Sequence, residues 1–429
     1  MVAARLSAPK INSPASGVFR GDARGLLALL PAGQPLFNAV ITSPPYWDLQ
    51  NYGEMRQIGF GQSAEAYLAD MRSVFQACAE VTTGDATMWL VVGFLRREHR
   101  IMMLPGLLTE EATKAGWIPR EWVTWEKQKS LPYARHGELR DITEHAVLLS
   151  KTDTHAFHVG SLLDPVPTST WWERYPERYS PRGRRPTNSW SIPIPTQGAW
   201  KEGPDHACPF PAELTFRLLS LVTQPDDWVL DPFAGVGSVP ALAEAMGRKS
   251  VGIELKQAYV NRYPQTLASS IEWWGEKCDR LEKQEGQRKL FAETIMKLRA
   301  LKFARVLALE LNALFGSVCW ISVTGSALRP SQPYADQVIE VEIATTSAEA
   351  PVLAAALEAI ERRPLSKFGI EPIFSVRPPD ASKVTGLWYV HGKFWKEPLE
   401  RFPGASLIPH VVAPFVPDVK TIRSWHGVE

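Results

Sequence analysis

The feature that most constrains the fold of this 429-residue chain is a series of short apolar runs, each ending in a tight turn. Three of them have the length and composition of buried strands: Phe37–Thr42, Thr87–Gly93 and Trp228–Leu230. Stretches with helical spacing of apolar residues lie around and between them, at Ser63–Val81, Leu104–Ala115 and Pro211–Val222. Strands that alternate with helices are typical of a parallel sheet covered by helices, so the pattern predicts an α/β fold.

Composition excludes several classes of protein. Lys+Arg 47 against Asp+Glu 46 gives a net charge of +1, which excludes a uniformly basic protein but is compatible with a local basic groove. No apolar run reaches the roughly 18 residues of a membrane span, and Met1–Pro14 has no signal-peptide core. The four widely spaced cysteines predict a reduced, cytoplasmic chain without a zinc module or other metal site: Cys78, Cys208, Cys278 and Cys319.

The first turn with chemical significance is Ser43-Pro44-Pro45-Tyr46, directly after an apolar run. Two consecutive prolines fix φ and remove two N–H donors, which leaves carbonyl oxygens as the polar groups. The Ser43 hydroxyl and the Pro44 carbonyl can accept hydrogen bonds from the exocyclic amino group of a nucleobase and direct its lone pair at an electrophile. Tyr46 offers a flat face to a base rotated out of its stack, where stacking is worth about 1–3 kcal/mol. A proline-bearing strand end with a core tyrosine is the structural alternative.

The second turn is Asp231-Pro232-Phe233-Ala234-Gly235-Val236-Gly237-Ser238, which leads into a helix predicted over Pro240–Met246. Its glycines let the backbone approach a ligand, and the start of the helix offers unpaired N–H groups. The next strand, Ser250–Leu255, carries Glu254 about 20 residues after Gly235, where an acidic side chain meets the ribose hydroxyls of a nucleoside cofactor. Pro240 replaces the third glycine of GxGxxG, which disfavours a nicotinamide dehydrogenase.

With these two turns, residues Val18–Leu267 resemble the amino-group DNA methyltransferases that use S-adenosylmethionine. The Ser-Pro-Pro-Tyr turn resembles their catalytic motif and Asp-Pro-Phe-x-Gly-x-Gly their cofactor motif, in the β order with the catalytic motif first. The resemblance implies a Rossmann-like methyltransferase sheet with helices on both faces, and S-adenosylmethionine as cofactor. It assigns catalysis to Ser43, Pro44, Pro45 and Tyr46, and cofactor binding to Asp22, Pro209, Phe210, Asp231, Phe233, Gly235, Gly237 and Glu254.

The resemblance also implies the reaction. The amino group of a flipped base attacks the sulfonium methyl directly, without a covalent enzyme adduct. A serine before Pro-Pro-Tyr is typical of cytosine-N4 enzymes, with adenine-N6 exceptions. We therefore expect a site-specific DNA methyltransferase that favours cytosine N4, with adenine N6 as the alternative and a non-catalytic DNA-binding module as the alternative of another class.

The division of the chain follows from the same pattern. We expect residues 1–150 to form the catalytic half of the core, residues 151–205 a target-recognition insert, and residues 206–270 the cofactor half. A boundary near Ala268–Gly275 precedes an α+β unit of residues 276–429, which has no counterpart in the family. Its predicted elements are one or two helices over Glu276–Leu314, strands at Val338–Ile343 and Trp388–Phe394, and a helix at Ala350–Arg362.

Double-stranded DNA is the expected partner. Residues Thr152–Pro204 are crowded with Pro, Arg and Trp, and arginine forks can read guanine edges or clamp phosphates. The same stretch could equally be a surface loop with solvated arginines. The oligomeric state and the existence of a cognate restriction endonuclease on a separate chain stay open. The expected DNA-binding residues are Trp47, Arg174, Arg178, Arg182, Arg184 and Arg185.

Three further residues have ordinary explanations beside functional ones. Asp48 could orient the catalytic turn or accept a proton, although a solvent-facing carboxylate is commoner. Cys208 is interpreted as a packing or cofactor-wall residue, because its order with Pro209 is the reverse of the carbon-5 cytosine methyltransferase motif. His145, at the start of an apolar strand, is expected to be a core histidine.

Overall fold

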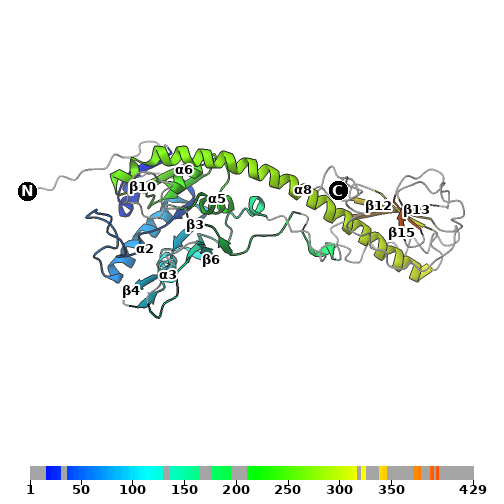
Figure 1. The fold of residues 1–429 in the computed structure, drawn as a ribbon, viewed down its shortest axis with the longest axis horizontal. Helices are drawn as coiled ribbons and strands as arrows, with labels where there is room; N and C mark the ends of the chain where they lie inside the picture. The colour runs from blue at the N-terminus through cyan, green and yellow to red at the C-terminus, as the bar shows by residue number, and fades with distance from the viewer. Residues whose placement is uncertain are drawn as a thin grey trace, which may run out of the picture. The chain divides into compact units, whose positions relative to one another are not determined.

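The structure is a computed structural model, which describes residues 16–29, 36–97, 99–128, 136–163, 175–180, 182–194, 210–315, 320–324, 338–344, 371–377, 387–390 and 393–395. The chain divides into two compact units. The first comprises Met1–Leu162 with Arg185–Arg280, and the second Leu163–Arg184 with Leu281–Glu429. Figure 1 labels the main helices and several of the strands.

An eight-stranded sheet forms the centre of the first unit, in the order β1-β10-β9-β2-β3-β7-β6-β8. The first five strands in this order run parallel, and β7 is antiparallel to both of its neighbours. This arrangement confirms the predicted α/β class. The strands are β1 (Gly17–Arg20), β2 (Phe37–Thr42), β3 (Thr82–Val92), β6 (Ile118–Glu126), β7 (Thr143–Ser150), β8 (Ser189–Ser191), β9 (Trp228–Asp231) and β10 (Lys249–Glu254).

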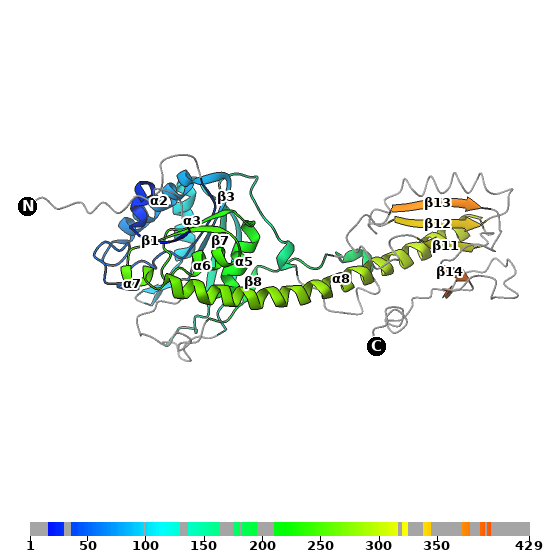
Figure 2. The ribbon, with the colours of Figure 1, turned by 90° about the horizontal axis from the view of Figure 1, so that it is seen from above.

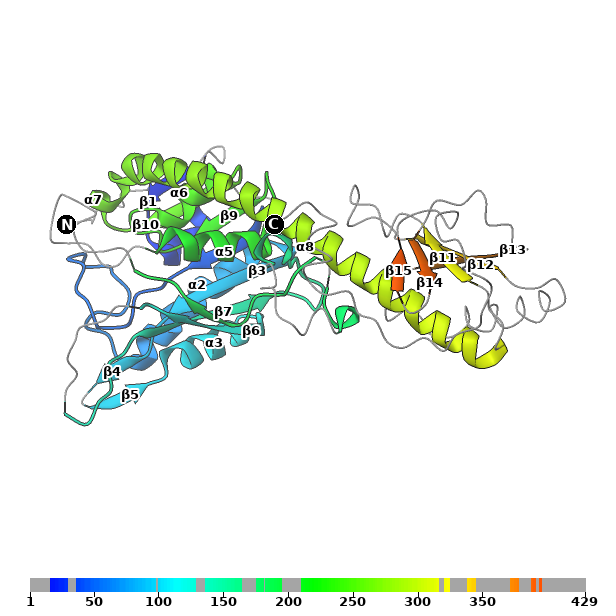
Figure 3. The ribbon, with the colours of Figure 1, turned by 45° about the vertical axis from the view of Figure 1, so that its right-hand side comes forward.

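Helices cover both faces of this sheet. In Figure 3, α5 and α6 lie on one side of the strands and α3 on the other; α2 packs against α3, and α5 against α6. The sequence pattern located these helices within a few residues, and Ser63 caps α2 by accepting a bond from the Ala66 N–H at 3.2 Å. The bounds are η1 (Ala23–Gly25), α1 (Leu26–Leu29), α2 (Ala64–Val81), α3 (Leu104–Lys114), α5 (Ala212–Val222), α6 (Ser238–Ala245) and α7 (Gln257–Val260).

The order of the strands brings the two turns together. After β2 the chain passes through α2 to β3 on one side, whereas after β9 it passes through α6 to β10 on the other. Since β2 and β9 are neighbours, the point where the strand order reverses lies between them. In open α/β sheets ligands bind at this switch point, outside the carboxyl ends of the strands. Both turns therefore occupy the expected position of a binding site.

Close packing of α6 on the sheet depends on Gly252 in β10. A Cβ at this position would lie 2.7 Å from Ala234 Cβ and 2.9 Å from Pro240 Cγ. The absence of a side chain lets the turn and the start of α6 lie directly against the strand. In dinucleotide-binding folds the third glycine of GxGxxG allows the helix to pack closely on the strand. In this protein Pro240 stands at that position of the helix, and Gly252 on the strand provides the space instead.

One continuous helix, α8 (Tyr263–Phe315), spans the predicted boundary at 268–275. The chain has no proline between Gln265 and Phe315, and Gly275 and Gly286 each cost only about 1 kcal/mol relative to alanine. The composition change near Gly275 therefore does not interrupt the helix, and the two compact units divide at Arg280 and Leu281 instead.

The second unit contains the later part of α8 and the segment around η3 (Pro176–Arg178). Arg299 Nε donates to the Pro176 carbonyl at 3.1 Å, and Lys302 pairs with Glu177 at 2.7 Å. Tyr179 packs against an apolar cluster on the helix, formed by Phe291, Ile295 and Leu298. These contacts place residues 175–180, within the predicted recognition insert, on α8.

A five-stranded sheet of order β13-β12-β11-β14-β15 completes the second unit, and Figure 2 shows three of its strands side by side. Residues 387–390 and 393–395 pair as two antiparallel strands where the sequence predicted one strand, and the predicted helix Ala350–Arg362 lies outside the described residues. Within the described ranges, no helix has an apolar stretch long enough to cross a membrane. The strands are β11 (Trp320–Thr324), β12 (Val338–Ala344), β13 (Glu371–Arg377), β14 (Leu387–Val390) and β15 (Lys393–Trp395).

Candidate active site

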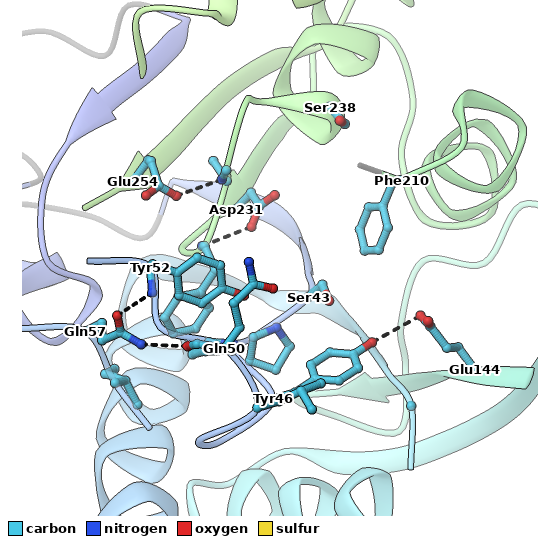
Figure 4. Close-up of a pocket in the computed structure, with 18 of the residues that line it drawn as sticks. Ser43, Tyr46, Gln50, Tyr52, Gln57, Glu144, Phe210, Asp231, Ser238 and Glu254 are labelled. Atoms are coloured by element: carbon cyan, nitrogen blue, oxygen red, sulfur yellow. Dashed lines mark hydrogen bonds between the residues drawn. The ribbon is translucent and has the colours of Figure 1, made fainter. Parts of the chain in front are cut away.

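Both turns line a single cavity of about 880 Å³ in the first unit. Ser43 and Tyr46 enter it from the end of β2, Asp231 from the end of β9, and Glu254 from the end of β10 (Figure 4). Small-molecule sites usually enclose about 300–1,000 Å³, so the cavity can hold a nucleoside cofactor together with part of a second ligand.

A tyrosine of α2 and the turn's own backbone fix the catalytic turn. The Tyr67 hydroxyl donates to the Pro45 carbonyl at 2.8 Å, and the Trp47 N–H donates to the same carbonyl at 2.9 Å. Burial raises the pKa of Tyr67, so its hydroxyl stays protonated and able to donate. The Pro45 carbonyl is therefore used internally, while Ser43 and Pro44 both line the cavity.

Tyr46 is half-buried and its hydroxyl donates to Glu144 Oε2 at 3.1 Å (Figure 4). The second oxygen of Glu144 accepts from Lys127 Nζ at 3.0 Å. Burial of the hydroxyl, together with the charge of Glu144, raises the pKa of Tyr46 well above its ordinary value, which keeps the phenol neutral. Sequence reasoning missed Glu144 and Lys127; a carboxylate at the start of an otherwise apolar strand was the one available signal.

Asp231 joins the two turns. It is buried, and its Oδ1 accepts from the Thr42 hydroxyl at 2.7 Å and from the Phe233 N–H at 3.1 Å. Burial raises the pKa of Asp231 to about 7, although these two hydrogen bonds act in the opposite direction. The predicted cofactor residue thus lines the cavity and also fixes the end of the neighbouring strand.

Glu254 closes the other side of the cofactor turn. Its Oε2 accepts from the Gly235 N–H at 2.9 Å and its Oε1 from the Lys256 N–H at 2.7 Å. Burial raises the pKa of Glu254 against the effect of these bonds. A Cβ at Gly235 would meet no atom within 4 Å, so the turn faces open space. A carboxylate, free space and a helix amino end together fit the ribose and the charged part of a nucleoside cofactor.

Asp22 also lines the cavity, but Arg24 occupies much of its carboxylate. The Arg24 N–H and guanidinium donate to both oxygens, at 2.9–3.1 Å. Burial alone would raise the pKa of Asp22, but the hydrogen bonds from Arg24 hold it below its ordinary value. Arg24 in turn pairs with Asp70 on α2 at 3.1 Å, so this carboxylate is part of an ionic network.

Of the remaining residues predicted to bind the cofactor, two line the cavity and one does not. Phe210 and Phe233 line the cavity, as Figure 4 shows for Phe210. Gly237 is not among the lining residues; a Cβ there would lie 2.5 Å from Tyr263 Cδ2, so this glycine is required for packing. Pro209 and Cys208 lie outside the described residues.

Among the described residues, the lining of the cavity includes none of those predicted to bind DNA. Trp47 donates from Nε1 to the Gln62 carbonyl at 2.9 Å and lies under Arg97. Arg178 is exposed and lies over the Tyr175 ring, with its guanidinium carbon 4.5 Å from the ring centroid. Arg182, Arg184 and Arg185 are exposed, and Arg174 lies outside the described residues. A DNA role for these residues stays a prediction.

Asp48 and His145 are both engaged in local contacts. Asp48 Oδ2 pairs with Arg97 on the hairpin formed by β4 (Leu95–Arg97) and β5 (Arg100–Met102), at 2.5 Å. His145 is buried, its Nδ1 accepts from Trp122 Nε1 at 3.0 Å, and burial lowers its pKa. These contacts fit a core histidine. Over the described residues, no group of three or more His, Cys, Asp or Glu side chains is arranged to hold a metal ion.

Known proteins resemble this chain over the same region. The type II methyltransferase M.Cfr9I of Citrobacter freundii is 27% identical over 57% of this chain and 85% of its own length. M.XycI of Xanthomonas campestris pv. cyanopsidis is 28% identical over the same shares. Among solved structures, the cytosine-N4-specific PvuII DNA methyltransferase is 20% identical, with a TM-score of 0.48, and the match covers 59% of this chain and 87% of that one.

The family model for DNA methylases acting at N6 or N4 matches residues 37–265. This region is more than half of the chain and contains the catalytic turn, the cofactor turn and Glu254. The protein therefore belongs to the DNA methylase family of amino-group methyltransferases, whose methyl donor is S-adenosylmethionine.

Proposed function

We propose that this DNA methylase transfers its methyl group to N4 of cytosine, at a specific sequence in double-stranded DNA. The observation that carries the proposal is that Ser43, rather than an aspartate or asparagine, precedes Pro-Pro-Tyr in a turn that opens into the same cavity as the cofactor turn. A neutral hydroxyl can accept a hydrogen bond from an exocyclic amino group, and a serine at this position is typical of cytosine-N4 enzymes.

The cofactor supplies an electrophilic methyl group on a sulfonium. Glu254 and the turn at Gly235 would hold its ribose, and Asp231, Phe233 and Phe210 would shape the remaining wall of its site. Asp22 would contribute at the adenine end of the cofactor, through the lone pairs of its carboxylate oxygens that do not accept hydrogen bonds from Arg24.

The catalytic turn would orient the target base. The Ser43 hydroxyl and the Pro44 carbonyl would accept the two amino hydrogens, because the Pro45 carbonyl already accepts two bonds within the protein. Tyr46 would stack on the flipped base. The amino nitrogen oriented in this way would take up the methyl group that the cofactor supplies, and the surplus proton would leave to solvent. Such positioning accounts for most of the acceleration in this type of reaction.

Mass spectrometry of nucleosides tests the proposal directly. Purified protein with S-adenosylmethionine and unmethylated DNA should produce N4-methylcytosine. Ser43→Ala should reduce the yield at least about 100-fold with cofactor affinity unchanged within about twofold, because it removes one oriented acceptor in the transition state. Ser73→Ala, an exposed serine on α2, is the matched control and should retain full activity.

Two results would point to the alternatives. Formation of N6-methyladenine in place of N4-methylcytosine would show that adenine is the substrate. DNA binding without methylation and without cofactor affinity would indicate a non-catalytic module.

We further assign target recognition to residues 151–205 and infer a role in restriction–modification. Exposed Arg182, Arg184 and Arg185 support DNA contact, and the type II relatives support a sequence-specific modification enzyme. Arg184→Glu with Arg185→Glu should weaken DNA binding and flatten its salt dependence. Unchanged DNA affinity in the double variant would place recognition elsewhere.

A further inference from the structure

We propose that Glu144, held by Lys127, is a positioning residue for Tyr46: it fixes the orientation of the aromatic ring through the hydroxyl and makes the ring face more electron-rich for the transition state. The inference rests on the proposed function only in requiring that a base amino group is methylated next to Tyr46, whichever base that is.

The first argument is geometric. Glu144 is in the antiparallel strand β7, whose neighbour β3 ends at the cavity. Its two carboxylate oxygens face different partners, the Tyr46 hydroxyl at 3.1 Å and the Lys127 ammonium at 3.0 Å. The carboxylate therefore cannot rotate without breaking one of two charge-assisted hydrogen bonds, and the hydroxyl of Tyr46 is tied to a fixed point on the sheet.

The second argument is steric. Gly93, directly after β3, leaves space for both side chains: a Cβ there would lie 3.2 Å from Glu144 Cγ and 3.5 Å from Tyr46 Cε2. The tyrosine ring and the aliphatic part of the glutamate thus pack over a glycine backbone. Tyr46 is constrained at both ends, by the two prolines before it and by Glu144 at its hydroxyl.

The third argument is electrostatic. Methyl transfer from a sulfonium would bring positive charge onto a base stacked against Tyr46. A phenol that donates a hydrogen bond to a carboxylate has a more negative ring face, which attracts a cation above it. Burial and the charge of Glu144 raise the pKa of Tyr46, so the proton stays on the phenol and the pair keeps this arrangement. The effect grows as charge develops, so it should increase kcat rather than substrate binding.

A double-mutant cycle tests this role. Glu144→Gln keeps an acceptor for the hydroxyl but removes the charge, and Tyr46→Phe keeps the ring but removes the hydroxyl. Each single variant should lower kcat about 10-fold with KM for DNA and cofactor affinity within about twofold, and the double variant should be little worse than Tyr46→Phe. Such non-additivity is not expected if Glu144 merely stabilises the fold.

Glu213→Gln is the matched control. Glu213 is also a partly buried carboxylate with two cationic partners, Arg217 at 3.0 Å and Lys277 at 2.8 Å, but it does not line the cavity. Its variant should retain wild-type kcat.

Three results would overturn the role of Glu144: additive losses in the double variant, a Glu144→Gln effect confined to KM, or loss of the cooperative unfolding transition in Glu144→Gln. A wild-type protein that methylates neither cytosine nor adenine would instead overturn the proposed function, and the role of Glu144 with it.

Discussion

The Thr42 hydroxyl donates to Asp231 Oδ1 across 2.7 Å, and this bond ties the strand that ends in the catalytic turn to the strand that ends in the cofactor turn. Both residues are buried. Their strands pair in parallel, with Val40 opposite Leu230, so the two turns begin at the same level of the sheet. The bond therefore fixes the distance between the groups that hold the base and those that hold the cofactor.

Thr42→Val should destabilise the protein by about 1–3 kcal/mol, because a buried carboxyl group then loses one of its two hydrogen-bond donors. Urea unfolding of the wild type and the variant measures the difference. Thr87→Val is a suitable control, since the Thr87 hydroxyl is buried on β3 without a hydrogen-bond partner among the described residues. It should be neutral or slightly stabilising, and equal losses in both variants would contradict the argument.

Asp231→Asn should remove a pH dependence of stability. The pKa of Asp231 rises from its ordinary 3.8 to about 7 in the folded protein. Its contribution is therefore fully present below pH 3.8 and is lost as the pH rises toward 7, because the unfolded state then releases the proton while the buried carboxyl of the folded state still holds it. The stability of the Asn variant relative to wild type should increase by up to about 4 kcal/mol between pH 4 and pH 8. A constant difference across this range, measured by urea unfolding, would show that Asp231 titrates normally.

Gly237→Ala should mainly reduce stability, whereas Gly235→Ala should mainly reduce cofactor affinity. Both glycines have positive φ, +85° and +55°, so alanine costs about 1–2 kcal/mol at either position. At Gly237 the new Cβ also meets Tyr263 and Val18, at 2.5 and 2.8 Å, and Tyr263 is held by a hydrogen bond to Glu244. Gly237→Ala should therefore lose about 1–3 kcal/mol more stability. Gly235→Ala should instead reduce cofactor affinity, because its Cβ enters the cavity. Thermal unfolding and calorimetric titration separate the two effects, and an identical pattern in both variants would refute the distinction.

Glu254→Gln should weaken S-adenosylmethionine binding about 10- to 100-fold. The carboxylate accepts from two backbone N–H groups, and an amide would turn its NH2 toward one of them while offering a weaker acceptor to ribose hydroxyls. Calorimetric titration gives the affinity directly. Glu244→Gln, on α6 but not in the lining of the cavity, should bind normally; unchanged affinity in Glu254→Gln would remove this residue from the cofactor site.

Much of the fold and part of the candidate site followed from local patterns. The strand Phe37–Thr42 and the helix after Ser63 were predicted almost to the residue, because apolar periodicity and capping chemistry act over a few positions. The predicted boundary near Ala268–Gly275 falls inside the continuous helix α8. A change of composition at Gly275 does not interrupt the backbone hydrogen bonds of a helix, so it was a poor guide to where the helix ends.

By itself the sequence determined the α/β class, the two turns and the family, since each depends on residues adjacent in the chain. Only the tertiary structure decided which side chains support those turns. Glu144 meets Tyr46 although 98 positions separate them, and Asp231 meets Thr42 across 189. Such pairs depend on the order and register of the strands, which bring distant residues to the same level of the sheet. The arginine-rich segment shows the same limit: its composition predicted contact with DNA, whereas packing on α8 is a property of the folded chain.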